Sequence, residues 1–443
     1  IVLLIAVSSN ANSPLTKINE QSGFRHSESV YKREVPDSLP QGVSNEWLNS
    51  LTDKNGSRLS NEDPEADALQ RKLFNGLVAS SQFGQSLHSA GDVNGDGYDD
   101  IIIGAPSYNS NTGRAYIYFG GASINTVPDV TLTGESVSSF FGISVSTAGD
   151  VNGDGYSDLI IGANGYSAST GKAYIYFGGA LMNNTADVTM TGEAGNNFFG
   201  YSASSAGDVN GDGYSDVIVG AYGYSSNTGR AYVYFGGSSM NNTSDVTITG
   251  EAVNSSLGVS VSSAGDVNGD GYSDVIAGAY EYSSYSGRAY IYFGGNSMNN
   301  TSDVTMTGEA ANIYFGISVS TAGDVNGDGY SDVIAGAYGY SSITGRAYIF
   351  FGGESMNNAA DVTITGETSG SYFGFSVSDA GDLNGDGYSD VIVGARGYST
   401  STGRAYMFLG GAIMNNTADI TVTGEATFNY FGNSVAFAGD VNG

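Results

Sequence analysis

The sequence predicts an all-β protein, specifically a β-propeller of four-stranded blades. Three observations lead to this fold: a 58-residue repeat, four strand-like segments in each unit, and connections rich in Gly, Asn, Ser and Asp. The composition agrees, because 67 of the 443 residues are Gly and 31 are Tyr, whereas only 14% are charged. These proportions are typical of a turn-rich β protein with a folded core.

The repeat extends over most of the chain. A Gly-Asp-hydrophobic tripeptide recurs at one constant interval, with its Asp at positions 92, 150, 208, 266, 324, 382 and 440. A Phe-Gly dipeptide opens the units at positions 83, 141, 199, 315, 373 and 431, and Leu257-Gly258 is the one departure. Six units are complete and the seventh stops soon after it begins, at Gly443, so we expect the sequence to be truncated there.

Each unit contains four candidate strands, which in the second unit are residues 143–148, 158–163, 172–177 and 187–191. The first, third and fourth alternate apolar and polar residues, whereas the second is a continuous apolar run. A strand that is apolar on both faces fits a blade between two neighbouring blades. Four antiparallel strands per unit, closed in a ring, make a propeller. The main alternative is a β-solenoid, whose coils are generally shorter than this repeat.

The chain divides into three segments. Residues 1–11 hold an apolar run followed by a small-x-small site, which predicts the tail of a signal peptide, with a short buried strand as the alternative. No initiator Met precedes it, so we expect the sequence to begin inside its reading frame. Residues 12–66 are not repetitive and predict a loosely ordered leader or a small extra element. The propeller occupies residues 67–443, and residues 68–77 are expected to form the strand that closes the ring.

Charge and composition exclude several functions. The net charge of −30 opposes nucleic acid and anionic membranes, and cations are the natural partners. The absence of Cys removes disulfides, thiolate catalysis and zinc-thiolate sites. No apolar stretch approaches the roughly 20 residues of a membrane-spanning helix. With only His26 and His88 and no nucleophile motif, we expect a protein that is not an enzyme.

An Asp-rich nonapeptide in every complete unit predicts a metal site. In the second unit its side-chain oxygens come from Asp150, Asn152, Asp154 and Asp158, with a backbone carbonyl from Tyr156. All of these donors are oxygen, which favours calcium, and six complete copies exceed what a turn requires. An EF-hand would carry Glu at position 12, where these units carry Ile, Val or Ala.

The combination of Phe-Gly, the Asp-rich loop and Gly-Ala at this spacing resembles the FG-GAP repeat of integrin α subunits and their bacterial relatives. The third motif is literal only at Gly104-Ala105-Pro106. The resemblance implies a seven-bladed propeller with about one Ca²⁺ per complete repeat, in the loop between the first two strands. Transferred position by position, the metal ligands are Asp92, Asn94, Asp96, Asp100, Asp150, Asn152, Asp154, Asp158, Asp208, Asn210, Asp212, Asp216, Asp266, Asn268, Asp270, Asp274, Asp324, Asn326, Asp328, Asp332, Asp382, Asn384, Asp386 and Asp390.

A ligand is expected on the face opposite the metal loops, because the loops between the second and third strands each carry a Tyr among Ser, Asn and Gly. These are Tyr108, Tyr166, Tyr224, Tyr282, Tyr340 and Tyr398, which could equally cover blade edges. Departures from the repeat at Glu281, Tyr285 and Arg396 mark positions where specificity could differ between blades. The repeated Arg of Gly-Arg-Ala-Tyr is expected to pair with a carboxylate between blades.

The sequence therefore predicts a secreted or cell-surface adhesion propeller, stabilised by calcium, whose partner is an extracellular protein or carbohydrate. Two alternatives stay open. One is a structural surface protein without a specific ligand, which near-identical units fit. The other is the non-catalytic part of a larger secreted enzyme.

Overall fold

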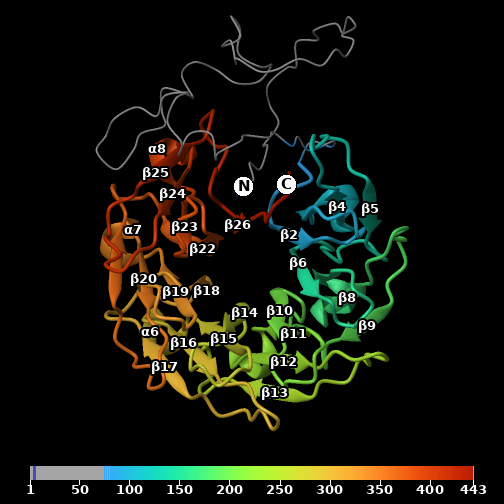
Figure 1. Cartoon of the computed structure of the whole chain (residues 1–443), viewed down its shortest axis with the longest axis horizontal. Coiled ribbons are helices and arrows are strands. Elements are labelled where there is room, and N and C mark those ends of the chain that lie inside the picture. The colour runs from blue at the N-terminus through green and yellow to red at the C-terminus, as the bar shows by residue number, and fades with distance from the viewer. Residues whose placement is uncertain (1–2, 6–73, 75, 77, 79, 443) are drawn as a thin grey trace, which may run out of the picture.

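The computed structural model describes residues 3–5, 74, 76, 78 and 80–442. Six antiparallel sheets of four strands follow one another along the chain and stand around a common axis (Figure 1). Within each sheet the strands lie in chain order from the axis outward. The prediction of a β-propeller with four-stranded blades is confirmed. The described residues form six such blades, and the seventh blade stays a prediction.

The strands agree with the sequence pattern to within about one residue at most ends. The innermost strands are β2 (Leu87–Gly91), β6 (Ser144–Gly149), β10 (Ala203–Gly207), β14 (Ser260–Gly265), β18 (Val319–Gly323) and β22 (Phe373–Gly381). The second strands are β3 (Asp100–Ala105), β7 (Asp158–Ala163), β11 (Asp216–Ala221), β15 (Asp274–Ala279), β19 (Asp332–Ala337) and β23 (Asp390–Ala395).

The third strands are β4 (Arg114–Tyr118), β8 (Lys172–Tyr176), β12 (Arg230–Tyr234), β16 (Arg288–Tyr292), β20 (Arg346–Phe350) and β24 (Arg404–Phe408). The outermost strands are β5 (Val130–Thr133), β9 (Val188–Thr191), β13 (Val246–Thr249), β17 (Val304–Thr307), β21 (Val362–Thr365) and β25 (Ile420–Thr423). Short helical turns separate the second and third strands: α3 (Tyr108–Asn111), α4 (Tyr166–Ser169), α5 (Tyr224–Asn227), α6 (Tyr282–Tyr285), α7 (Tyr340–Ile343) and α8 (Tyr398–Ser401).

The core lies between blades. Every residue of β7 is buried, as expected for a strand covered on both faces. One hydrophobic cluster joins Ile102 and Ile117 of the first blade to Phe141, Leu159 and Tyr174 of the second. Equivalent clusters fill the next junctions, so each blade is stabilised by both of its neighbours.

The Phe-Gly and Gly-Ala dipeptides recur together because their glycines pack against each other across a junction. A Cβ atom on Gly162 would collide with the carbonyl oxygen of Gly200 in the next blade. Phe199, beside Gly200, is 1% exposed and fills the space between the two blades. Only glycine permits this close backbone approach, so the motif is a packing device between units.

The ring closes through the start of the seventh unit. Strand β26 (Val435–Phe437) packs between β22 and β2. The N–H groups of Asp99 and Gly121 donate to the carbonyls of Asp440 and Val441, at 3.0 and 2.9 Å. Equivalent bonds join the second blade to the first, from Ser157 and Gly179 to Asp92 and Val93. The inner strand at the seventh position thus contacts the first blade as each inner strand contacts the next blade.

Strand β1 (Leu3–Ile5) pairs antiparallel with β26, with Leu4 opposite Ala436. The apolar run of residues 1–7 thus includes a strand, which was the alternative to a signal peptide. The signal peptide stays a prediction. Residues 12–66 lie outside the described residues, as do 68–73, 75 and 77 of the expected closing strand.

Candidate functional site

The Asp-rich nonapeptides form the connection between the first two strands of each blade. In the second blade Asp150 follows β6 and Asp158 begins β7, so a β-hairpin holds both ends of the loop. Gly153 and Gly155 have φ of 77° and 90°, a left-handed conformation that glycine adopts without a steric cost. The structure thus brings the four predicted side-chain ligands of a unit into one tight turn, and does so in six blades.

The loop's own N–H groups hold its side chains. The Asp150 carboxylate accepts hydrogen bonds from the N–H groups of Gly153 at 2.7 Å and Gly155 at 2.9 Å. The amide oxygen of Asn152 accepts the N–H of Asp154 at 2.8 Å. The other five loops repeat these contacts at distances from 2.6 to 3.0 Å. The turn is therefore pre-shaped by hydrogen bonding and by its glycines.

The last Asp of each loop is buried. Asp158 is fully shielded, and its carboxylate accepts the N–H groups of Val151 at 2.9 Å and Gly178 at 2.8 Å. Burial raises its pKa to about 7, the two N–H groups oppose that rise, and the nearby carboxylates of Asp154 and Asp150 add to it. The equivalent residues have the same pKa of about 7; they are Asp100, Asp216, Asp274, Asp332 and Asp390. A cation in the loop would relieve this excess of negative charge.

The donors fit a hard cation. Each loop offers three carboxylates and one amide oxygen. In the second loop Oδ1 of Asp150 accepts two N–H groups, whereas each other carboxylate oxygen accepts one hydrogen bond and keeps a second lone pair. Among residues 3–5, 74, 76, 78 and 80–442, no three or more Asp, Glu or His side chains already surround one point as a cage. The loop therefore supplies the chemistry of a calcium site, and its side chains would turn inward around an ion.

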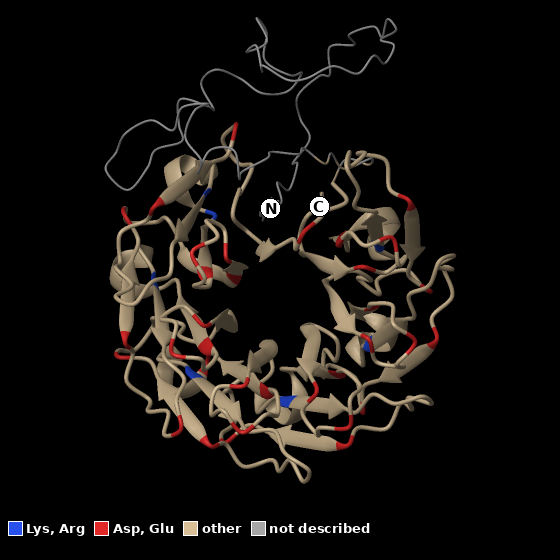
Figure 2. Ribbon diagram, in the orientation of Figure 1, with Lys and Arg blue, Asp and Glu red and all other residues tan. Residues whose placement is uncertain are grey.

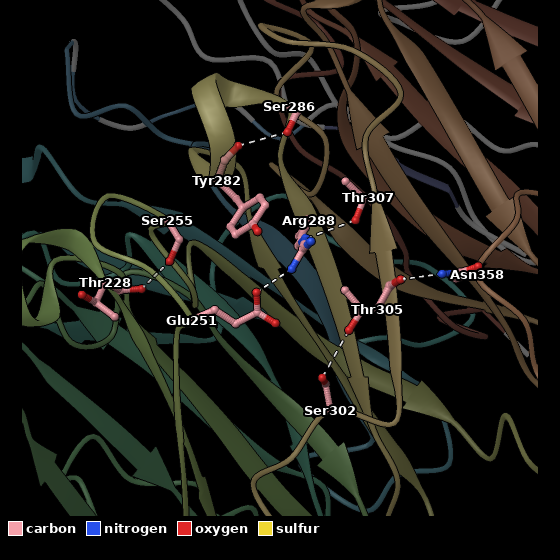
Figure 3. A network of polar contacts seen from close by, with 10 residues as sticks. All are labelled: Thr228, Glu251, Ser255, Tyr282, Ser286, Arg288, Ser302, Thr305, Thr307 and Asn358. Atoms are coloured by element: carbon pink, nitrogen blue, oxygen red, sulfur yellow. Dashed lines mark hydrogen bonds and ion pairs between the residues drawn. The ribbon is translucent and has the colours of Figure 1, made fainter.

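The helical turns lie at the opposite end of each blade from the Asp loops, and their tyrosines pack beneath the repeated cation. In the fourth blade the Arg288 guanidinium lies 3.9 Å from the ring centre of Tyr282 (Figure 3). Its Nε donates to the hydroxyl of Thr307 at 3.1 Å, and Nη1 pairs with Glu251, which lies between the third and fourth blades. Equivalent pairs form in the second to sixth blades, where the prediction that this repeated cation pairs with a carboxylate between blades is confirmed.

All six candidate tyrosines occupy this position. The distance from cation to ring centre is between 3.6 and 4.0 Å in every blade. Each Tyr is half-buried, while the two residues that follow it are exposed. On this face the polar turn residues, and not the tyrosine rings, are the most accessible groups.

The fourth blade carries a carboxylate where most blades carry a glycine. In four blades an aromatic ring lies against a Gly that begins the turn, as Phe140 does with Gly165, Phe198 with Gly223, Tyr314 with Gly339 and Tyr372 with Gly397. The first blade carries Gln82 and Ser107 at these positions, joined by a hydrogen bond. The fourth carries Ser256 and Glu281, and the Ser256 hydroxyl donates to Glu281 at 2.6 Å. Tyr280 donates to the other oxygen of Glu281 at 2.9 Å, so two hydroxyl groups hold this carboxylate.

A pocket of about 720 Å³ opens beside Glu281, between the third and fourth blades. Its lining includes Val253, Asn254, Tyr282 and Tyr285. The structure therefore brings together Glu281 and Tyr285, two of the three departures seen in the sequence.

The third departure, Arg396, belongs to the sixth blade, where its guanidinium lies 3.5 Å from the ring centre of Phe375. Sequence reasoning also missed Ser256, the partner of Glu281. Comparing both positions across the six units would have revealed the coupled change.

These features define the class of protein: a β-propeller with an acidic hairpin loop in each of its six described blades. The family model for the FG-GAP repeat matches six segments, residues 83–118, 141–176, 199–234, 257–292, 315–350 and 373–408. The chain therefore carries FG-GAP repeats and is a propeller of the integrin-α type.

Several integrin α chains are similar to it. Integrin alpha-5 of Xenopus laevis is 38% identical over 165 residues, 34% of this chain and 16% of that protein. Human integrin alpha-6 is 30% identical over 250 residues, 49% of this chain and 22% of that protein. The matched part is thus less than a quarter of either relative.

A solved structure, the fungal lectin of Aleuria aurantia with a six-bladed β-propeller fold, matches at a TM-score of 0.41. It is 10% identical and the match covers 80% of this chain and 95% of the lectin, a likeness too low to carry weight. Among the described residues, no helix is long and apolar enough to cross a membrane.

Proposed function

We propose that this chain is a calcium-stabilised extracellular adhesion propeller, which binds a protein or carbohydrate through the face opposite its Asp loops. The observation that carries the proposal is the same acidic loop in six successive blades, each with a buried carboxylate of raised pKa. Electrostatic repulsion within each loop favours a bound cation. The similarity to integrin α chains supports the binding role and a secreted or cell-surface location.

In the second blade the side-chain oxygens of Asp150, Asn152, Asp154 and Asp158 and the carbonyl of Tyr156 would hold the ion. Their oxygen chemistry and number suit calcium better than magnesium, which keeps most of its water. The role of calcium here is structural, because it would neutralise carboxylates in a hairpin that lies at the junction with the next blade. At a tenfold excess over its Kd, each ion would stabilise the fold by about 1.4 kcal/mol.

The pocket beside Glu281 is the favoured place for a ligand. In a chain of near-identical units, the fourth blade carries a hydroxyl and a carboxylate in place of an aromatic ring and a glycine, and the pocket lies at that exchange. The aromatic ring and glycine of the neighbouring blades pack against each other at the same place, so packing alone does not require the exchange. The first blade also exchanges this pair, for Gln82 and Ser107, but the exchange in the fourth blade adds a carboxylate beside a pocket, so the binding role is preferred.

The enzyme alternative has weaker support. His88, the only histidine in the described ranges, lies on β2 with Nδ1 3.0 Å from the Ser89 carbonyl oxygen. Several propellers are enzymes, but their catalytic residues form a constellation that the fold alone does not provide. The repeats thus favour a binding scaffold, and no catalytic residue is assigned.

We further propose that residues 68–77 close the ring as the outermost strand of a seventh blade. Phe74 stands one repeat length before Leu132 and packs at 4.6 Å, ring centre to ring centre, against Tyr118. A Cβ on Gly76 would meet Phe83 at 2.8 Å, just as one on Gly134 would meet Phe141 at 2.7 Å. These contacts support the position of the strand. The signal-peptide remnant at residues 1–11 and secretion belong to the same proposal.

Two measurements test the function. Thermal unfolding of the full chain with calcium and with chelator should differ by many degrees, with about one ion bound per loop. Binding to panels of extracellular matrix proteins and glycans should be lost in the double variant S256F/E281G, which restores the pair found in the neighbouring blades. Equal melting temperatures would refute the metal, and undiminished binding by the double variant would refute the pocket.

A further inference from the structure

Consecutive Asp loops touch each other directly. The ring of Tyr156, at position 7 of the second loop, contacts Gly95, at position 4 of the first. A Cβ atom added to Gly95 would lie 2.5 Å from this ring. The contact recurs at every junction between complete loops. The other pairs are Gly153 with Tyr214, Gly211 with Tyr272, Gly269 with Tyr330 and Gly327 with Tyr388.

Backbone hydrogen bonds join the same loops. The N–H of Ser157 donates to the carbonyl of Asp92 at 3.0 Å, and the N–H of Gly179 donates to that of Val93 at 2.8 Å. The preceding residue, Gly178, donates to the carboxylate of Asp158 at 2.8 Å. A single Gly-Gly turn therefore connects a ligand residue of one loop to the backbone of the loop before it.

From these contacts we infer that the six loops bind calcium cooperatively, each occupied loop ordering its neighbours. This inference rests on the proposed calcium binding. The carbonyl of Tyr156 is a proposed ligand in its own loop, while its ring lies on the preceding loop, so an ion that fixes the carbonyl also restrains the ring. Binding that orders a neighbouring segment lowers the entropy that the next ion must overcome.

The coupling runs only between adjacent loops, as in other linear repeat arrays. The first loop has no complete Asp loop before it among the described residues, and Gly385 of the sixth loop has nothing within 4 Å of an added Cβ. Among the described residues the array therefore runs from Tyr98 to Gly385, with five internal junctions. A break in the middle should divide it into two shorter arrays.

Two matched variants compare an internal junction with the first loop of the described array. Tyr214→Ala keeps the backbone carbonyl but removes the ring from Gly153, which separates loops one and two from loops three to six. Tyr98→Ala removes the equivalent ring from the first loop of the described array, before which no complete loop is described. Both variants lose the same side chain at the same position of the loop.

The test is calcium titration of the full chain by calorimetry, with the stoichiometry measured independently by equilibrium dialysis. We expect about six ions and a Hill coefficient of roughly 2 for the unaltered chain and Y98A. Y214A should still bind about six ions, with a lower Hill coefficient. Six ions bound with a Hill coefficient of 1 in the unaltered chain, or equal Hill coefficients in the two variants, would overturn the coupling. No bound calcium would instead overturn the metal assignment, and the coupling with it.

Hydrogen exchange provides a second readout should Y214A fold poorly. Asp212→Asn weakens the third loop with an isosteric change. At subsaturating calcium, the coupling predicts that protection also falls in loops 150–158 and 266–274, but not in loop 382–390. Loss confined to residues 208–216 would overturn the inference.

Discussion

The Arg288 contact offers the sharpest test of how the blades are joined. Its guanidinium stacks on Tyr282, donates to Thr307 and pairs with Glu251 across the junction (Figure 3). The Arg288 side chain is 22% exposed and that of Glu251 46%, so the ion pair contributes little, about 0.5 kcal/mol. The stacking on Tyr282 and the hydrogen bond to the Thr307 hydroxyl add about 1 kcal/mol each. Arg288→Ala should therefore cost about 2.5 kcal/mol.

The second blade supplies a natural control for this variant. Lys172 replaces the Arg there, and its Nζ lies 2.8 Å from Glu135 and 4.0 Å from the ring centre of Tyr166. Lysine has no Nε–H to reach the threonine hydroxyl, so Arg288→Lys should lose only that bond, about 1 kcal/mol.

Urea unfolding at fixed calcium measures both variants, with the midpoints compared at an unchanged m-value. A loss below about 0.5 kcal/mol for R288A, within the range of ordinary surface substitutions, would refute the role of this residue in joining blades. Equal losses for R288A and R288K would contradict the division of the energy among the three contacts.

Three further predictions concern packing, pH and ring closure. Gly162→Ala places a methyl against a carbonyl of the next blade and should lower the free energy of unfolding, measured in urea, by about 3 kcal/mol. As a control, the added methyl of Gly179→Ala meets nothing within 4 Å, so this variant should lose only about 1 kcal/mol. The pKa of Asp158 and its equivalents is raised to about 7 from an ordinary 3.8, so their contribution to stability is present below the ordinary value and is lost as pH rises through the raised one. The melting temperature in chelator should thus fall as the pH is raised toward and past 7. A rise would contradict the burial of these carboxylates. Calcium affinity should increase over the same pH range, because the carboxylates lose their protons. Phe74→Ala should destabilise the fold by about 3 kcal/mol, as we expect for Leu132→Ala at the equivalent position, and a neutral result for Phe74 alone would contradict the closing strand.

Figure 2 shows how the charges are distributed: Asp and Glu recur around the whole ring, whereas Lys and Arg are sparse. The excess of acidic groups therefore cannot be neutralised by side chains within the described ring. This is consistent with the net charge of −30 over the whole sequence. Mobile or bound cations must supply the balance, which is the physical reason that calcium and pH are expected to act on stability together.

The strands and loops could be predicted because they depend on local patterns. Alternation in residues 143–148 and a continuous apolar run in 158–163 each predict a strand, and strands form at Ser144–Gly149 and Asp158–Ala163. The Asp loop could be identified because six copies stand at one spacing. The number of strands at the seventh position could not be derived, because it depends on which segments meet there, and β1 pairs with β26 from the opposite end of the chain.

The contacts of the turns opposite the Asp loops were harder to predict for the same reason. The sequence left open whether Tyr282 faces a ligand or covers a blade edge. In the structure its ring is half-buried under Arg288, which the start of β16 brings over it. The exchange of an aromatic ring for Ser256 was visible in the sequence, yet its meaning depends on Glu281, which a separate turn carries to it. Each of these pairs is separated by a turn whose path a linear pattern does not define.

Repetition itself constrains where a ligand site can arise. A substitution at a junction must be matched on the facing unit, because every blade is covered by two neighbours and a Cβ at several glycines would meet backbone. The turns on the face opposite the Asp loops contact solvent, and there two positions were enough to exchange a ring for a carboxylate without disturbing β14 or β15. The Asp loops have no such freedom, because the same nine residues serve their own hairpin and the next loop. The turns on one face can therefore differ between blades while the Asp loops stay uniform, which would keep the proposed ligand binding apart from the proposed metal-dependent stability.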